Sequence, residues 1–345
     1  MNEKMIELGK KRSVIRELFE YGKKRKALIG AENVFDFSIG NPSVPTPKAV
    51  TDAMERLIRE TEPVALHGYT SAQGDLRVRK SIADSIEKRF GVKADPELIY
   101  MTCGAAASLT VTLNALTVAG DEVIVPSPFF PEYKVFTENA GARLVSVPLS
   151  EPDFQLDIDK IAKAITDKTR AVIINSPNNP TGNDLLRSEI EKLLREFEGL
   201  VILDEAYSDF SESPSFLLDL DKYPNLVVFQ TFSKAWGCAA IRLGMAFAST
   251  EIIGILSKIK YPYNVNQLTQ KQAIEMLHKY YEIERWVKRL KEEREDLEKR
   301  FSELPLTVEV FPSDANFFLA RVTDAVKIYN YLVGEGIIVR NRNSI

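Results

Sequence analysis

The chain of 345 residues is 45% hydrophobic and 27% charged, so it can bury a large core, and its length predicts one large domain with a smaller one. Its formal net charge of −4 gives no indication of binding to nucleic acid or to an acidic membrane surface. Two cysteines and two histidines argue against a disulfide framework, a histidine-based metal site or a Ser-His-Asp triad.

The first 26 residues are charged throughout and lack the apolar core of a signal peptide. No uninterrupted apolar run of about 18 residues occurs, so no transmembrane helix is expected. We therefore expect a cytoplasmic protein whose partners are small molecules, with no nucleic acid, membrane or metal among them.

In chain order, residues 3–28 predict a charged helical arm, 35–50 an extended segment that leads into a helix, and 75–92 an amphipathic helix. Seven apolar runs then predict strands, and most of them alternate with helical patterns. Such alternation is typical of a mostly parallel sheet covered by helices on both faces, an α/β fold. The run 265–304 predicts one or two long charged helices, and the remainder predicts strand, strand, helix and strand.

Polar residues collect where the predicted strands end, which is where open α/β sheets bind ligands. Gly104 ends a strand and opens a helix at Ala105 and Ala106, whose backbone N–H groups suit a phosphate, although an ordinary tight turn has the same pattern. No G-x-G-x-x-G or P-loop motif is present, so a nucleotide is not indicated.

Three further strand ends carry chemistry. Asn175, Asn178 and Asn179 lie in "INSPNNPTG", which is also a plausible simple turn. Asp204, followed by Tyr207, is either a helix N-cap or the partner of a cation.

Lys234 ends the next strand within "TFSKAWG", and Arg242 follows eight residues later. An isolated lysine of this kind usually reaches solvent along its apolar stem. Together with the other strand ends, however, these residues suit pyridoxal phosphate. An amine forms a Schiff base, a carboxylate keeps the pyridine nitrogen protonated, and arginine binds the phosphate.

The motifs "SPNNPTG", "LDEAY" and "TFSKAWGCAAIRLG", in this order and spacing, resemble those of the fold-type-I pyridoxal-phosphate-dependent aminotransferases of classes I and II. The second half, from about Asn183, resembles the histidinol-phosphate aminotransferases, notably in "TFSKAWGCAAIRLGMAFAS" and "GEGIIVRNRNSI". The first half, with "SIGNP" and "YTSAQGDL", resembles class I enzymes that act on aspartate, alanine or aromatic amino acids.

The resemblance implies a role for each matching residue. Lys234 forms the Schiff base and shuttles the proton, Asp204 pairs with the pyridine nitrogen, and Tyr207 bonds O3′ of the cofactor, so these three are the expected catalytic residues. The remaining cofactor residues implied are Gly104, Ala105, Ala106, Phe130, Asn179, Thr231, Ser233 and Arg242, with Tyr69 reaching the phosphate of the neighbouring subunit.

Gly40 and Asn179 are the implied substrate-binding residues, and the shared site implies a homodimer. The expected fold is a mostly parallel seven-stranded sheet sandwiched by helices, with a smaller α+β domain built from the two chain ends. We expect an N-terminal arm and part of the small domain in 1–45, the pyridoxal-phosphate-binding domain in 46–265, and the rest of the small domain in 266–345. The family usually continues beyond this point with an arginine that binds the substrate carboxylate, so the resemblance implies a shortened small domain.

The activity implied is transfer of an amino group between an amino acid, or histidinol phosphate, and a 2-oxo acid such as 2-oxoglutarate, as in amino-acid and histidine biosynthesis. Two alternatives use the same lysine motif. One is a β-lyase of this fold that acts on cysteine conjugates, and the other is a chain that binds pyridoxal phosphate without catalysis.

Overall fold

The computed structural model describes residues 6–7, 10 and 14–343. The chain divides into two compact units. The larger unit comprises Pro42–Phe301 and Val310–Leu319, and the smaller comprises Met1–Asn41, Ser302–Glu309 and Ala320–Ile345.

The larger unit is built on a seven-stranded sheet with the strand order β2-β8-β7-β6-β5-β3-β4. β8 runs antiparallel to its neighbours β2 and β7, and the other adjacent strands are parallel. The strands are β2 (Ile99–Thr102), β3 (Glu122–Ser127), β4 (Arg143–Pro148), β5 (Thr169–Asn175), β6 (Leu200–Asp204), β7 (Leu226–Thr231) and β8 (Gly244–Phe247).

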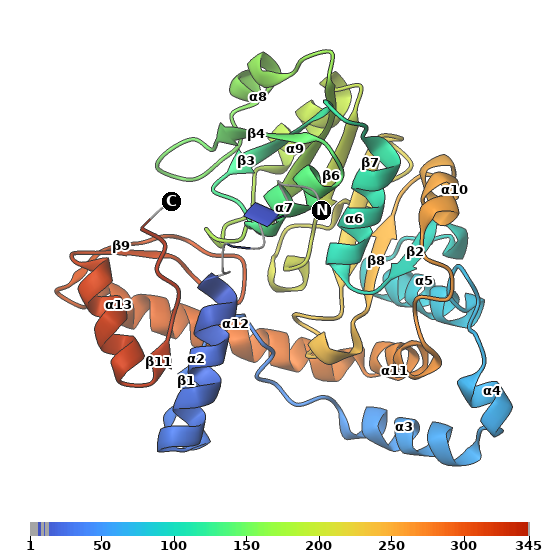
Figure 1. Cartoon of the computed structure of the whole chain (residues 1–345), viewed down its shortest axis with the longest axis horizontal. Helices are drawn as coiled ribbons and strands as arrows, with labels where there is room; N and C mark the ends of the chain where they lie inside the picture. Colours follow the sequence, from blue (N-terminus) through green and yellow to red (C-terminus); the bar gives the residue numbers. More distant parts are fainter. Residues whose placement is uncertain (1–5, 8–9, 11–13, 344–345) are drawn as a thin grey trace. The chain divides into compact units, whose positions relative to one another are not determined.

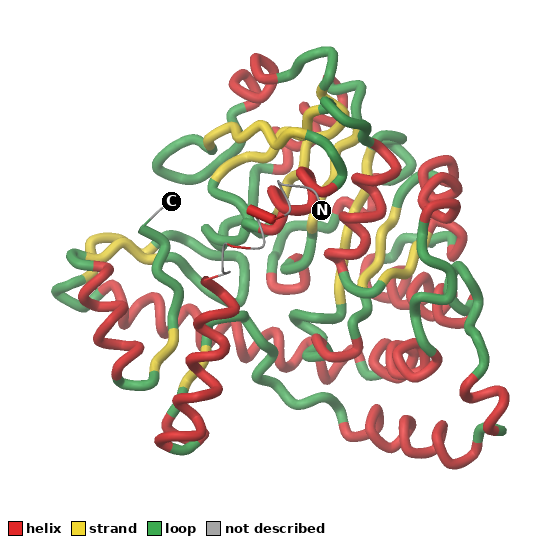
Figure 2. The backbone as a smooth tube through the Cα atoms, viewed as in Figure 1, coloured by secondary structure: helices red, strands yellow, loops and turns green. Residues whose placement is uncertain are grey.

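Helices cover both faces of this sheet, because successive strand residues point to opposite sides and both sides are apolar. Ile173 packs with Leu109 of α6 in one buried cluster, whereas its neighbour Ile174 packs with Leu193 of α9 in the other. Figure 2 shows the helices on either side of the strands. The helices are α3 (Lys48–Glu60), α4 (Pro63–His67), α5 (Leu76–Phe90), α6 (Ala105–Leu116), α7 (Glu132–Asn139), α8 (Ile158–Ala164), α9 (Arg187–Glu196), α10 (Thr250–Ile259), α11 (Gln267–His278) and α12 (Tyr280–Ser302).

Parallel pairing brings the carboxyl ends of β5, β6 and β7 to one edge of the sheet. Asn175 lies opposite Asp204, and Asp204 lies opposite Phe229. The polar residues that close these strands are therefore neighbours in space although they are about 30 residues apart in sequence.

The smaller unit is an α+β arrangement of segments from both ends of the chain. β1 (Phe35–Asp36) pairs in parallel with β11 (Ile337–Ile338), and Leu18, Val34 and Ile338 form its small buried cluster. Its other elements are α2 (Val14–Ile29), β9 (Thr307–Val310), β10 (Ala320–Val322) and α13 (Ala325–Gly334).

The predicted fold class is confirmed, including the seven strands and the small unit formed by the two ends. The helices α4 and α10 and the antiparallel direction of β8 were not predicted. From residue 14 onward the predicted arm at 3–28 corresponds to α2, and its residues 3–5, 8–9 and 11–13 lie outside the described residues.

α11 packs against α3 and α5 and is therefore grouped with the larger unit, as is α12 up to Phe301. The domain boundary near residue 265 stays a prediction from sequence. Within the residues that the structure describes, no helix is long and apolar enough to cross a membrane.

The core residue Ile174 offers a test of the layered packing. Its side chain is fully buried in β5, so Ile174→Ala removes apolar contacts and leaves a cavity, and we expect a loss of roughly 2–5 kcal/mol in the free energy of unfolding, measured by urea denaturation. Ile58→Ala is the matched control, because Ile58 is 55% exposed on α3, and we expect it to change stability by less than about 0.5 kcal/mol. Equal effects of the two substitutions would contradict this assignment of the core.

Candidate active site

Asp204, the last residue of β6, is bound on both carboxylate oxygens. The hydroxyl of Tyr133 donates to Oδ2 at 2.8 Å, and the backbone N–H of Ala206 donates to Oδ1 at 3.1 Å. Burial raises the pKa of Asp204 above its ordinary value, and the two hydrogen bonds and the charge of Lys234 lower it again without cancelling the effect of burial. The interpretation of Asp204 as a simple N-cap is not supported, because the next helix is the short 3-10 helix Ser208–Phe210, whose N-cap residue is Tyr207.

Asn175 links two strand ends to the loop that follows β5. Its side-chain amide donates to the backbone oxygen of Asp204 at 2.8 Å, and its Oδ1 accepts from the backbone N–H of Asn179 at 2.7 Å. The "SPNNPTG" loop is therefore fixed relative to Asp204, and Asn179 is directed toward the same edge.

Lys234 and Asn179 meet at Tyr207. Lys234 lies three residues after the end of β7, and its Nζ is 5.3 Å from the centroid of the Tyr207 ring. The amide of Asn179 donates to the Tyr207 hydroxyl at 3.4 Å. Lys234 is half-buried and faces an aromatic ring, so the expectation that an isolated lysine reaches solvent does not describe its position.

Gly104 and Arg242 form a small cradle at the start of α6. Gly104 has φ +91°, and a Cβ on it would lie 2.5 Å from Nη2 of Arg242. A Cβ on Gly244 would lie 2.3 Å from the carbonyl carbon of Gly104, so the two backbones touch. The exposed Arg242 thus lies beside the first N–H groups of α6, at Ala105 and Ala106, and this is a favourable arrangement for an anion.

Thr231 and Ser233 order the turn between β7 and Lys234. The Thr231 hydroxyl accepts from the Ser233 backbone N–H at 3.1 Å and donates to Ser233 Oγ at 3.0 Å. Oγ1 of Thr231 also lies 3.2 Å from the backbone oxygen of Leu243, the residue that follows Arg242, so the turn contacts the segment that carries Arg242.

Phe130 is half-buried and meets Tyr133 edge to face, with ring centroids 5.6 Å apart. Tyr69 is 88% exposed, and its ring lies 4.8 Å from the ring of Tyr263, tilted by 35°. Gly40 has φ +61° and is exposed in the smaller unit.

Two residues of this edge were not predicted as site residues. Tyr133 lies in "FFPEYKV", three residues after Phe130, a spacing of about one helical turn that is the only sequence signal for it. Asn175 was noted as a polar strand end, but its double role became visible only through the strand register.

A second polar network holds the loop after Lys234. The indole of Trp236 donates to Oδ2 of Asp209 at 3.1 Å, while Arg89 binds Oδ1 of the same carboxylate at 2.5 Å. The Arg89 guanidinium also lies 4.6 Å from the centroid of the Tyr280 ring. This network connects α5 and α12 to the residues that follow Lys234.

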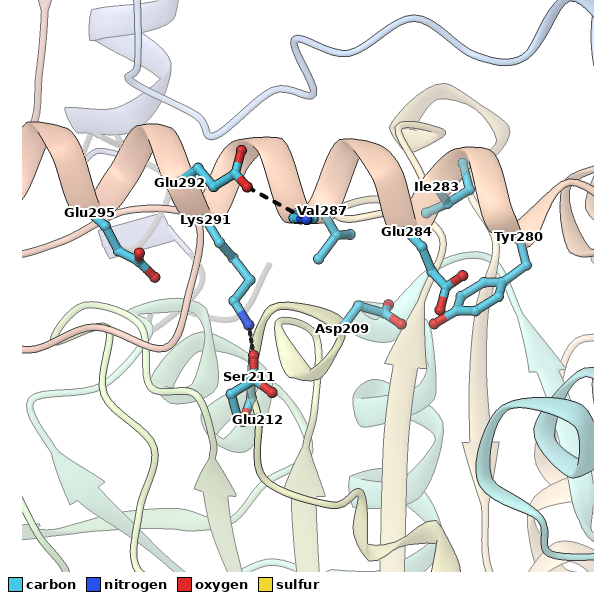
Figure 3. Close-up of a pocket in the computed structure, with 11 residues that line it drawn as sticks. Asp209, Ser211, Glu212, Tyr280, Ile283, Glu284, Val287, Lys291, Glu292 and Glu295 are labelled. Carbon is cyan, nitrogen blue, oxygen red and sulfur yellow. Dashed lines mark hydrogen bonds and ion pairs between the residues drawn. The ribbon is translucent and has the colours of Figure 1, made fainter.

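A pocket of about 620 Å³ lies between α12 and residues 209–212, and Asp209 is one of the residues that line it (Figure 3). Lys291 points from α12 toward Glu212 and forms an ion pair with it. Among the described residues, those predicted to bind a cofactor do not line this pocket, most of whose lining residues belong to α12. We therefore do not assign it to the predicted chemistry.

The residues at the sheet edge fit pyridoxal phosphate as a donor set. Because Gly104 carries no Cβ, the Arg242 guanidinium can approach the start of α6 closely, where an anion would meet both the guanidinium and the first N–H groups of the helix. Asp204 presents a carboxylate already held on both oxygens, and Lys234 supplies a primary amine beside a phenol. Arg242 and Asp204 are thus suited to the phosphate and to a cationic ring nitrogen, respectively.

Comparisons with known proteins give one consistent family. A family model described as "Aminotransferase class I and II" matches residues 32–345. The chain is 64% identical over 254 residues to a histidinol-phosphate aminotransferase of Bacteroides thetaiotaomicron, covering 73% of each chain, and 46% identical over 252 residues to one of Parabacteroides distasonis, again covering 73% of each. The first matched stretch is longer than the 163 residues from Asn183 to the end, so the similarity extends upstream of Asn183.

Solved structures agree with these sequences. An amino transferase from Eubacterium rectale superposes with a TM-score of 0.83 at 36% identity, covering 98% of this chain and 89% of that chain. An aspartate aminotransferase from Thermotoga maritima superposes with a TM-score of 0.84 at 26% identity, covering 98% of this chain and 90% of that chain.

Tyr133 can be tested through its effect on Asp204. Tyr133→Phe removes the hydroxyl that stabilises the charged carboxylate, so we expect the pKa of Asp204 to rise further. The measurement is a pH titration of ¹³C-labelled aspartate carboxyls by NMR, with the resonance assigned by its loss in Asp204→Asn. Tyr100→Phe is the control, because the buried Tyr100 hydroxyl donates to the Leu256 carbonyl instead. An equal shift in both variants would contradict a direct role of Tyr133.

The raised pKa of Asp204 also predicts how stability depends on pH. A carboxyl group whose pKa is higher in the folded than in the unfolded state contributes stability below its unfolded pKa, near 3.9, and loses this contribution as pH rises through the folded pKa. Asparagine mimics the protonated form, so we expect ligand-free Asp204→Asn to be more stable than the parent protein at neutral pH.

The stability advantage of Asp204→Asn is expected to grow as the pH rises above about 4, the unfolded pKa, in urea denaturation. Asp84→Asn, at an exposed position of α5, serves as the control and should show no such growth. A difference between Asp204→Asn and the parent that stays constant over this range would disprove the link to ionisation.

Proposed function

The chain belongs to the class I and II aminotransferases, and from that premise we propose that it moves the amino group of histidinol phosphate to a 2-oxo acid such as 2-oxoglutarate, with pyridoxal phosphate as cofactor. The chain is a transaminase of a family of pyridoxal-phosphate enzymes whose substrates are small molecules. The cofactor's binding to this chain, the amino donor and the site roles below are our proposals.

The observation that carries the proposed donor is the 64% identity over 254 residues to the histidinol-phosphate aminotransferase of Bacteroides thetaiotaomicron. Aspartate is the competing donor, because aspartate aminotransferases share the fold, but the identity to them is much lower, 26% for the enzyme of Thermotoga maritima. The β-lyase and the non-catalytic alternatives are not favoured by these relatives.

Bound pyridoxal phosphate would supply a protonated aromatic ring that withdraws electrons from the substrate α-carbon. We assign the cofactor phosphate to the cradle of Gly104, Ala105, Ala106 and Arg242, supported by the exposed guanidinium beside the start of α6. Thr231 and Ser233 would add hydroxyl groups to it from the ordered turn before Lys234.

We assign the ring nitrogen to Asp204. A proton on that nitrogen is stabilised by a nearby carboxylate, and the bonds from Tyr133 and Ala206 hold this carboxylate in one orientation. Phe130 would lie against the ring face, since its own ring is fixed by an edge-to-face contact with Tyr133.

The Lys234 amine would hold the cofactor covalently and, once the substrate amine has replaced it there, would be free to act as the base that moves a proton from the substrate α-carbon. Tyr207 and Asn179 would donate hydrogen bonds to O3′ of the cofactor, in keeping with the contact between them. Asn179 and the Gly40 backbone N–H are proposed to bind the substrate carboxylate.

A homodimer with shared sites is proposed from Tyr69. Its side chain is 88% exposed, and the apolar side chains of Tyr261 and Val64 are 83% and 79% exposed. An exposed aromatic group that stacks on another exposed tyrosine is suited to burial against a second copy, where its hydroxyl would reach the partner's phosphate group.

The proposal is tested with purified protein incubated with pyridoxal phosphate and borohydride, followed by peptide mass analysis. We expect the label on the peptide that contains Lys234 and its loss in Lys234→Ala. We also expect the parent protein to form glutamate from 2-oxoglutarate faster with histidinol phosphate than with aspartate or phenylalanine. The rate of Lys234→Ala with histidinol phosphate should be lower than that of the parent by at least about 10²-fold.

Three outcomes would contradict the proposal, each in a different part. Label on another lysine would reject the role of Lys234. Faster glutamate formation with aspartate would reject the proposed donor. Release of pyruvate from cysteine conjugates without any glutamate would favour the lyase.

A further inference from the structure

The segment between β9 and β10 brings an aromatic ring to Tyr207. β9 and β10 pair with each other, yet the last residue of β9 and the residues that connect it to β10 belong to the larger unit, as Val310–Leu319. Within this segment the ring of Phe317 meets the ring of Tyr207 edge to face, with centroids 5.2 Å apart and an interplanar angle of 79°. This geometry is one that aromatic pairs prefer.

Tyr207 is thereby held from several sides. The amide of Asn179 contacts its hydroxyl, the Nζ of Lys234 lies 5.3 Å from the centroid of its ring, and Phe317 contacts the ring as well. The hydroxyl oxygen of a tyrosine lies on the axis of its second side-chain torsion, so the first torsion sets where the oxygen lies. A ring packed against the side of the phenol restricts this first torsion and thereby the position of the hydroxyl.

The segment that carries Phe317 is fastened to the loop after Asn179. The backbone N–H of Asp314 donates to the Gly182 carbonyl at 2.8 Å, and the Asp314 carboxylate accepts from the backbone N–H of Asp184 at 2.7 Å. Gly182 has φ +90°, and a Cβ there would lie 2.6 Å from Oγ of Ser313. These contacts fix the segment relative to the loop after Asn179, and none of them involves the Phe317 side chain.

A second fastening comes from α12. Nη1 of Arg294 donates to the Ala315 carbonyl at 2.6 Å, and the Ala315 N–H donates to Ser313 Oγ at 3.1 Å. Ala315 is fully buried. Both backbone polar groups of Ala315, two residues before Phe317, are thus hydrogen-bonded, which fixes the backbone from which the Phe317 side chain extends.

Phe318 provides an internal comparison. It follows Phe317 directly, and its ring meets Phe301 of α12 at 5.6 Å and 70° rather than Tyr207. Both rings are half-buried. Two adjacent residues of the same type therefore share the same segment and similar exposure, but only Phe317 of the pair has a ring contact with Tyr207 in the described part of the chain.

We propose that Phe317 is a positioning residue of the active site, which orients the Tyr207 hydroxyl toward O3′ of the cofactor. The inference rests on the proposed function, because it assumes that pyridoxal phosphate binds beside Tyr207. A hydroxyl that donates to O3′ stabilises the deprotonated form of the cofactor's bond to lysine and lowers the pH at which the visible absorption band changes. Phe317 acts on this midpoint through Tyr207 and does not touch the reacting atoms.

The test is a pH titration of the visible absorption band of the loaded protein in the variants Phe317→Leu and Phe318→Leu. We expect Phe317→Leu to raise the midpoint pH by about 0.5 or more, toward the value of Tyr207→Phe, and Phe318→Leu to leave it unchanged. In the Tyr207→Phe background Phe317→Leu should cause no further rise, since the hydroxyl on which it acts is gone.

Phe317→Tyr keeps an aromatic ring and should retain the parent midpoint, and it also serves if Phe317→Leu does not fold. The inference is overturned if both leucine variants shift the midpoint equally, if neither does, or if Phe317→Leu shifts it in the Tyr207→Phe background as well. If the parent protein shows no band with pyridoxal phosphate, the proposed function itself fails, and that result is separate from all of these.

Discussion

In the register of β5, β6 and β7, Asn175 lies beside Asp204, and Asp204 lies beside Phe229. The candidate site depends on this register. A slip of one residue in β6 would turn the Asp204 side chain to the opposite face, away from the Tyr133 hydroxyl. The alternation that places Ile202 and Leu203 of β6 in different buried clusters fixes the register, because a slip would exchange the residues that fill the two clusters.

The same edge requires a balance between burial and charge. Asp204 is held in a poorly solvated position that raises its pKa. Hydrogen bonds from Tyr133 of α7 and from the Ala206 backbone N–H offset part of this rise. A carboxylate placed in this way is unfavourable for the empty protein and favourable once a cation lies against it. Asp204 therefore behaves as residues of functional sites do, where a local cost to stability accompanies the chemistry.

Much of this site was accessible from sequence, because motif residues directly follow apolar strands. Lys234, Asp204 and Asn179 could be expected at one edge, since parallel strands bring their carboxyl ends together. Tyr133 and Phe317 were not, because their relation to Asp204 and Tyr207 comes from helix orientation and from a distant segment, neither of which leaves a periodic pattern. The antiparallel direction of β8 was missed for a similar reason, because an apolar run predicts a buried strand but not whether that strand runs parallel or antiparallel to its neighbours.

The larger unit is not one continuous stretch of sequence, because Val310–Leu319 returns to it after β9. A fragment that ended at Phe301 would leave the Gly182 carbonyl without the Asp314 N–H, and Arg294 without the carbonyl of Ala315. Exchange of parts between this chain and a relative meets the same difficulty. The turn around Gly182 and the segment around Ser313 fit each other within van der Waals distance, so they have to be taken from the same parent.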